Sequence, residues 1–319
     1  MTRRRAASRL LHVVGLLAGG AVGLALLQCW PQRAIGRRWA ALGTRVLARA
    51  ILDAVQVEVR VVGPRVAGAA VYVANHLSWI EVLALLVVLP DARLVGKADV
   101  EAWPLIGTLA RALGVLSVDR TRRTDVRRVI PLMIDALGAG ESVLFFPEGT
   151  TSEGATVLRF HTALFEAAVR VGAPVVPIGV RLRVVGATTA TARTLCWTGD
   201  TSLLAHVPEV ARVRRSTCVL RLSDPLLTSP VAPNCRRARS RARKELAAAA
   251  RARIVRTTQP TDGIRVSYTA LVTPPHTTTR ATTEVIARVA VVSTSWRQSQ
   301  GAVPNHVVGE KRAGSISKN

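Results

Sequence analysis

The sequence predicts an α/β fold with a largely parallel sheet flanked by helices and an N-terminal membrane-anchoring helix. Short apolar runs alternate with longer segments of helical character through the middle of the chain, which is typical of strand–helix–strand units. Most of these runs are apolar throughout, as expected of strands buried on both faces in a parallel sheet. A nearly continuous apolar segment over residues 10–30 predicts the anchoring helix.

The expected elements follow from the apolar runs and from the residues that interrupt them. The helix that begins at Trp79 ends before Pro90, because proline cannot continue a helix. Another helix begins after Thr124 and ends before Gly138. In chain order, the expected strands are 57–62, 69–74, 93–96, 115–118, 143–146, 174–180 and 218–222, and the further helices are 103–113, 162–171 and 235–254.

The start of the chain has the features of a membrane anchor. The apolar segment 10–30 is long enough to span a bilayer and lacks a clear Ala-x-Ala site, which indicates an uncleaved helix rather than a signal peptide. Arginines flank both of its ends, so the positive-inside rule gives no orientation and an in-plane anchor is also consistent. Residues 39–55 form either an amphipathic helix on lipid headgroups or an ordinary packed helix.

The composition favours an anionic partner. The chain of 319 residues carries a formal charge of +24, while aromatic residues make up only 4%. Such a charge suits a membrane surface or nucleic acid, but no zinc-finger spacing or RNA-binding aromatic signature supports nucleic acid. The four cysteines are scattered without a Cys-x-x-Cys pair, so no metal site is predicted.

A histidine and a carboxylate lie where the expected strand 69–74 passes into the next helix. His76 is in the loop after the strand, and Glu81 is in the first helical turn, where Ser78 and Glu81 fit a capping box. On a single helix the His76 and Glu81 side chains would point about 140° apart, so their pairing depends on this break. Two interpretations stay open: a loop histidine beside a helix cap, or an imidazole base oriented by a carboxylate.

A second polar turn follows the apolar run 143–146. It contains Glu148 and Gly149, and a glycine permits close backbone approach. Ligands of parallel α/β sheets bind beyond the carboxyl ends of the strands. Because His76, Arg120 and Glu148 each follow an expected strand directly, we expect them to share one site. The chain has no Gly-x-Ser-x-Gly elbow, which argues against a serine hydrolase.

Four segments in this order resemble the motifs of the glycerolipid (1-acylglycerol-3-phosphate type) acyltransferase family. The first is Asn75-His76 followed by Glu81, and the third is Phe146-Pro-Glu-Gly-Thr-Thr-Ser152. The second runs from Gly96-Lys-Ala-Asp99 through Trp103-Pro-Leu-Ile-Gly107 to Asp119-Arg120, and the fourth is Ala173-Pro-Val-Val-Pro-Ile178.

The resemblance implies an O-acyltransferase that moves a fatty acyl group from acyl-CoA or acyl carrier protein to the free hydroxyl of a lysolipid. The leading acceptor is 1-acylglycerol-3-phosphate, which would give phosphatidic acid. His76 is expected to be the general base, oriented by Glu81, in a direct transfer that needs no cofactor besides the acyl-donor substrate. The residues expected to bind substrate are Asn75, Ser78, Lys97, Arg120, Glu148, Gly149, Thr150 and Pro177.

The resemblance gives some of these residues distinct roles. Arg120 occupies the family's phosphate-binding position, and a planar guanidinium suits a phosphate. Lys97 is a further candidate cation, suggested by its charge. Glu148 and Gly149 match the third motif, which contributes to acceptor binding in the family. Pro177 matches the fourth motif, which is linked to the acyl donor.

Two residues depart from the family pattern. Glu81 replaces an aspartate and is one methylene longer, which alters the geometry of its pair with His76. Thr151 replaces an arginine, and this variant resembles the bacterial branch that includes lyso-ornithine lipid acyltransferases, as does Trp197-Thr-Gly-Asp200. A lyso-ornithine lipid, which has no phosphate, is therefore the alternative acceptor. A non-catalytic basic membrane- or nucleic-acid-binding protein is a further alternative.

The predicted organisation has three parts: a membrane anchor with an amphipathic helix (1–56), an acyltransferase domain (57–254) and a disordered basic tail (255–319). The tail is rich in threonine and has no sustained periodicity. Because acyl donors of this family are cytosolic, we expect the protein at the inner (cytoplasmic) membrane, in contact with membrane lipids, with its catalytic domain facing the cytosol.

Overall fold

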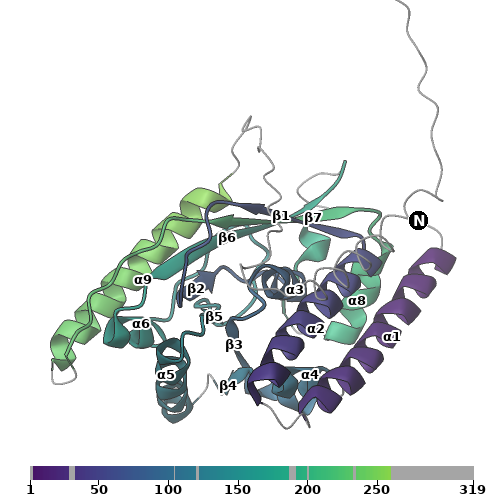
Figure 1. Cartoon of the computed structure of the whole chain (residues 1–319). Coiled ribbons are helices and arrows are strands. Elements are labelled where there is room, and N and C mark those ends of the chain that lie inside the picture. Colours follow the sequence, from purple (N-terminus) through teal and green to yellow (C-terminus); the bar gives the residue numbers. More distant parts are fainter. Residues whose placement is uncertain are drawn as a thin grey trace, which may run out of the picture. The chain divides into compact units, whose positions relative to one another are not determined.

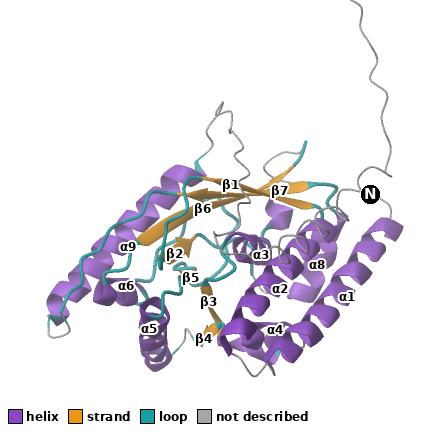
Figure 2. Cartoon of the chain, in the orientation of Figure 1, coloured by secondary structure: helices purple, strands orange, loops and turns teal. Residues whose placement is uncertain are grey.

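The centre of the structure is a seven-stranded sheet with helices on both faces (Figure 1 and Figure 2), which confirms the predicted fold class. The computed structural model describes residues 3–28, 33–103, 105–119, 122–186, 192–199, 201–232 and 235–259. These residues fall within one compact unit, residues 1–266. The strands are β1 (Val57–Val62), β2 (Val71–Ala74), β3 (Arg93–Lys97), β4 (Leu116–Val118), β5 (Val143–Phe145), β6 (Val175–Val184) and β7 (Ser216–Leu222).

The sheet is largely parallel, as predicted, with one reversal. The strand order is β1-β7-β6-β2-β5-β3-β4, and the five strands from β6 to β4 are parallel. β7 pairs antiparallel with β6 and parallel with β1, because the chain leaves β6 at Val184 and returns at Ser216, its direct partner. All five parallel strands end at one edge of the sheet, which brings the loops after them together.

Two apolar cores lie on opposite faces of the sheet. One packs around Leu52, Ile80 and Val210, from α2 (Arg33–Ala54), α3 (Trp79–Val88) and α8 (Leu203–Arg212). The other packs around Met133, Phe165 and Ala250, from α5 (Arg123–Gly138), α6 (Phe165–Val171) and α9 (Arg236–Thr258). Shorter helices connect these elements: η1 (Ala98–Ala102), α4 (Ile106–Ala112) and η2 (Arg193–Leu195).

The apolar N-terminal segment forms α1 (Arg3–Gln28), of which residues 6–23 are long and apolar enough to cross a membrane. α1 packs against α2, α4 and α8, and Gly20 lies directly over the Leu47 side chain. The Arg9 Nη1 group donates to Ala211 O at 3.0 Å and Val213 O at 2.9 Å, at the end of α8. α1 is therefore attached along one side to helices that flank the sheet.

Two differences from the sequence-based elements stand out. No prediction covered α8, in which Pro208 interrupts the helical pattern; it is nonetheless helical, with the Ser202 hydroxyl accepting from the N–H of Ala205 at its start. α9 continues to Thr258, so residues 255–258 belong to this helix and not to the predicted tail. Residues 260–319, the remainder of that tail, lie outside the described residues.

Candidate active site

The polar loops after β2 and β5 lie side by side at the carboxyl edge of the sheet. Val73 of β2 pairs with Phe145 of β5, so His76 and Glu148 follow neighbouring strands at the same level. The backbone of His76 makes two bonds to the second loop, with its N–H donating to Glu148 Oε1 at 3.0 Å and its carbonyl accepting from Ser152 N–H at 2.9 Å. The structure thus brings these two predicted segments together.

His76 and Glu81 form a close pair. The imidazole Nδ1 lies 2.7 Å from Glu81 Oε1, and the His76 side chain is 13% exposed while that of Glu81 is fully buried. A carboxylate can only accept, so the Nδ1–H donates to it and Nε2 is left with a free lone pair. This is the tautomer that a general base requires.

The backbone holds Glu81 in place. The same Oε1 atom accepts the N–H groups of Leu77 and Ser78, each at 2.7 Å. The Ser78 bond is the carboxylate half of the predicted capping box. Ser78 itself is completely buried at the N-cap of α3.

The ring of Phe146 supports the imidazole from the side. The two ring centroids are 4.1 Å apart, with an interplanar angle of 18°. Stacking on a buried ring limits rotation of the imidazole about its own side chain. Sequence reasoning missed this contact, although the third motif begins at Phe146, directly after β5.

Glu148 is a buried bridge between three chain segments. It is 4% exposed, and its Oε2 accepts from Leu158 N–H at 3.0 Å while Oε1 accepts from His76 N–H at 3.0 Å. Burial raises the pKa of this carboxyl, and the two backbone N–H bonds act in the opposite direction. Both oxygens accept backbone N–H groups, so the observed contacts of Glu148 are structural, and its predicted contact with substrate stays a prediction.

Gly149 has a conformation that explains the residue type. Its φ is +73°, and a Cβ at this position would lie 3.0 Å from Cδ2 of His161. A side chain here would meet both backbone strain and a close contact. The neighbouring Thr150 is exposed at the turn.

Asn75 joins β2 to β6 and does not face an open site. Its Oδ1 accepts from Val180 N–H at 2.7 Å and its Nδ2 donates to Val180 O at 3.1 Å, with the side chain buried. Pro177 is buried within β6 opposite Val73. The predicted substrate contacts of Asn75 and Pro177 stay predictions, and the observed contacts of both residues are structural.

The structure describes one of the two predicted cations, Lys97. Lys97 ends β3, is 57% exposed and forms an ion pair with Asp99. Arg120, the expected phosphate-binding residue, lies outside the described residues.

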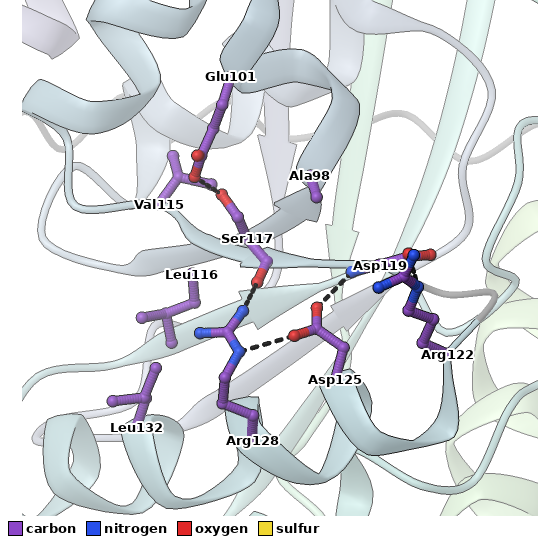
Figure 3. A pocket seen from close by; sticks show the side chains of 10 residues that line it. All are labelled: Ala98, Glu101, Val115, Leu116, Ser117, Asp119, Arg122, Asp125, Arg128 and Leu132. Carbon is purple, nitrogen blue, oxygen red and sulfur yellow. Dashed lines mark hydrogen bonds and ion pairs between the residues drawn. The ribbon is translucent and has the colours of Figure 1, made fainter.

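A cavity of about 450 Å³ opens near the predicted second motif, at edge strand β4 (Figure 3). Asp125 accepts from Arg128 and from the N–H of Asp119, each at 2.6 Å, and Arg128 also donates to Ser117 O at 2.9 Å. The bond to Arg128 is the main cause that lowers the pKa of Asp125. β5 and β3 separate this cavity from the loop of His76.

Residues after β6 brace the loop of His76, which sequence reasoning did not anticipate. His206 of α8 accepts from Trp79 Nε1 at 3.0 Å and its other ring nitrogen lies 3.1 Å from Thr194 O. Burial lowers the pKa of His206, which favours the neutral ring that this arrangement needs. Trp197 N–H donates to Leu77 O at 2.8 Å.

Comparisons with known proteins agree with this geometry. Residues 55–181 match the Acyltransferase family. The chain is 34% identical over 230 residues to a lyso-ornithine lipid O-acyltransferase of Pseudomonas aeruginosa, which covers 71% of this chain and 86% of that protein. It is 31% identical over 137 residues to a 1-acyl-sn-glycerol-3-phosphate acyltransferase of Neisseria meningitidis, a match that covers 42% of this chain and 53% of that protein.

A solved structure shares the fold. The crystal structure of the 1-acyl-sn-glycerophosphate acyltransferase from Thermotoga maritima superposes with a TM-score of 0.56 at 18% identity, and the match covers 80% of this chain and 96% of that one.

Proposed function

The chain belongs to the glycerolipid acyltransferase family and is an O-acyltransferase, and we propose that it uses His76 to transfer a fatty acyl group from a thioester to the free hydroxyl of a lysolipid. The observation that carries this proposal is the imidazole held by Glu81 at 2.7 Å, whose Nε2 bonds to none of the residues that the structure describes. An alcohol is a weak nucleophile until its proton is removed, and histidine is the side chain that most often removes such a proton in enzymes.

The proposed reaction is direct. Nε2 of His76 takes the proton of the acceptor hydroxyl as the oxygen attacks the thioester carbonyl carbon. The tetrahedral intermediate then collapses, the C–S bond breaks, and the imidazolium returns a proton to the thiolate that leaves. Glu81 stabilises the imidazolium between these steps, since its carboxylate accepts the Nδ1–H. The acyl donor is acyl-CoA or acyl carrier protein.

The comparisons favour lyso-ornithine lipid as the acceptor. The match to the lyso-ornithine lipid O-acyltransferase spans 86% of that protein, whereas the match to the 1-acyl-sn-glycerol-3-phosphate acyltransferase spans 53% of that one. Thr151 agrees with this choice, because it replaces the family's arginine and so removes a positive charge next to the expected phosphate. We therefore propose lyso-ornithine lipid first.

The second candidate acceptor is 1-acylglycerol-3-phosphate. It is supported by Arg120, which stands at the family's phosphate-binding position at the end of the second motif. A guanidinium binds a phosphate through two parallel hydrogen bonds, which an ornithine head group does not require.

The proposed location is the cytoplasmic face of the inner membrane. α1 presents exposed apolar side chains along one side, at Leu11, Val14, Val22 and Leu26, while Trp39 and Val46 of α2 are also exposed. The opposite side of α1 packs against α2, α4 and α8. An apolar stripe on a helix attached to the domain suits an anchor that lies in the interface, with the active site close to its lipid substrate.

The test supplies both acceptors to membranes that contain the protein, with a labelled acyl donor and a His76→Ala variant as control. Label in ornithine lipid that disappears in the variant is the expected result. Label in phosphatidic acid alone would identify the second acceptor. Equal labelling by the His76→Ala variant would show that another group is the base.

A further inference from the structure

One arginine attaches helix α9 to a loop beside the candidate active site. Arg251 donates from Nε to Leu158 O at 2.8 Å and from Nη2 to Val157 O at 2.5 Å. α9 lies against β6 and α6 on the face of the sheet opposite α3 (Figure 1). The guanidinium thus uses two of its fixed donors on two consecutive carbonyls, which holds the loop in one position.

The peptide group between Val157 and Leu158 extends this connection to His76. Its carbonyl accepts from Arg251, and its N–H donates to Glu148 Oε2 at 3.0 Å. The other oxygen of Glu148 accepts the backbone N–H of His76 at 3.0 Å. One peptide group therefore lies between a cation and a carboxylate, and each polarises it in the direction that strengthens the other bond.

Glu148 depends on this support because it is buried. Burial raises its pKa, and the nearby charge of Glu81 acts in the same direction, whereas the two N–H bonds and His76 lower it. A protonated Glu148 would replace one accepting oxygen with a hydroxyl and so weaken a bond to His76 or Leu158. Arg251 supports the ionised form indirectly, because it holds the Val157–Leu158 peptide, whose N–H donates to Glu148 and lowers its pKa.

We propose that Arg251 is a positioning residue of the acyl transfer: through the Val157–Leu158 peptide and Glu148, it fixes the backbone of His76 and thereby the imidazole base. The inference rests on the proposed role of His76. Arg251 lies outside the segment 55–181 that matches the Acyltransferase family.

The test compares two arginines of α9 that make the same kind of bond. Arg251→Met removes the donors to Val157 and Leu158 and keeps a long apolar side chain. Arg253→Met is the matched control, because Arg253 Nη1 donates at 2.6 Å to the carbonyl of Asp224, and within the described part of the chain no hydrogen bond joins Asp224 to His76, Glu81 or Glu148. Both variants are assayed for kcat, for KM of each substrate and for thermal unfolding, in the full-length protein.

Arg251→Met is expected to lower kcat roughly ten- to hundredfold, because a displacement of about 1 Å at a reacting group can cost that much. Both KM values are expected to change little. The acid limb of its pH–kcat profile should move to higher pH, since Glu148 protonates more readily when the released loop weakens the Leu158 N–H bond that lowers its pKa. Arg253→Met should keep the wild-type kcat and profile. Equal kcat in the two variants would overturn the inference.

A double-variant cycle tests whether Arg251 acts through Glu148. The losses caused by Glu148→Gln and Arg251→Met should be strongly non-additive if the two residues share one path. Additive losses would overturn the inference. If Arg251→Met does not fold, Arg251→Lys takes its place. A lysine is expected to bond only one of the two carbonyls, so the loss in kcat should be smaller. A wild-type kcat in Arg251→Lys would overturn the inference. The proposed function is tested separately: if the wild type is active and His76→Ala is not, it holds whatever the Arg251 variants show.

Discussion

Glu81→Gln is expected to slow the reaction while the protein stays folded. In the wild type, Glu81 Oε1 accepts from His76 Nδ1 and from the N–H groups of Leu77 and Ser78, each at 2.7 Å. Glutamine keeps an oxygen for these donors. It removes the negative charge that stabilises the imidazolium formed when His76 takes the substrate proton.

The magnitude follows from the strength of the bond to the imidazole. A hydrogen bond to a charged group contributes about 1.5–3 kcal/mol, against about 0.5–1.5 kcal/mol for a neutral one, so the transition state loses roughly 1–2 kcal/mol. Since about 1.36 kcal/mol corresponds to a factor of ten in rate, kcat should fall about five- to thirtyfold. KM should be nearly unchanged, because the imidazolium exists only during the reaction.

The assay measures initial rates of acyl transfer at saturating donor and acceptor, with thermal unfolding of the same preparations. Glu81→Ala is the comparison, because it leaves the buried N–H groups of Leu77 and Ser78 without their acceptor, which costs about 1–3 kcal/mol of unfolding free energy for each group. A Gln variant with wild-type kcat would refute the role of the charge. A loss of activity that only parallels unfolding would refute it as well.

Two further predictions concern residues that brace the site. Asn75→Ala should lower the unfolding free energy by about 1–3 kcal/mol for each backbone group of Val180 that loses its partner, without a selective rise in the KM for the acceptor. Denaturant unfolding measures the first effect and steady-state kinetics the second. A raised acceptor KM at unchanged stability would instead indicate that Asn75 binds substrate. The pKa of His206 is lowered by burial, so its contribution to stability is present above its unfolded pKa of about 6.5 and is lost as the pH falls. His206→Gln should therefore unfold with a weaker dependence on acidic pH than the wild type, and parallel curves for the two proteins would contradict this.

The strands and the paired loops could be predicted because their signals are local. Most of the expected strands are apolar runs, and His76 and Glu148 lie just beyond two of them. The reversal of β7 could not be predicted, because it depends on where the chain re-enters the sheet opposite Val184. α8 was missed because Pro208 breaks its pattern, although its N-cap at Ser202 was present in the sequence.

The roles of single polar side chains were harder to predict than their places. Asn75 and Glu148 belong to motifs that resemble those of the acyltransferase family, and both were predicted to bind substrate. In the structure, Asn75 bonds the backbone of Val180, and Glu148 bonds the backbone of His76 and Leu158. Such partners are remote in the sequence, so no spacing identifies them. For the same reason nothing near Arg251 in the sequence indicates its bonds to Val157 and Leu158.

The longer side chain of Glu81 fits because the backbone determines where its oxygen lies. Oε1 sits at the point where the N–H groups of Leu77 and Ser78 converge, and the imidazole of His76 reaches that same atom. Phe146 restricts the ring from the side, and Glu148 fixes the peptide that carries it. Three contacts therefore set the position of the imidazole. With the ring held in this way, the longer side chain of Glu81 still forms a hydrogen bond to Nδ1 of ordinary length for a carboxylate acceptor, 2.7 Å.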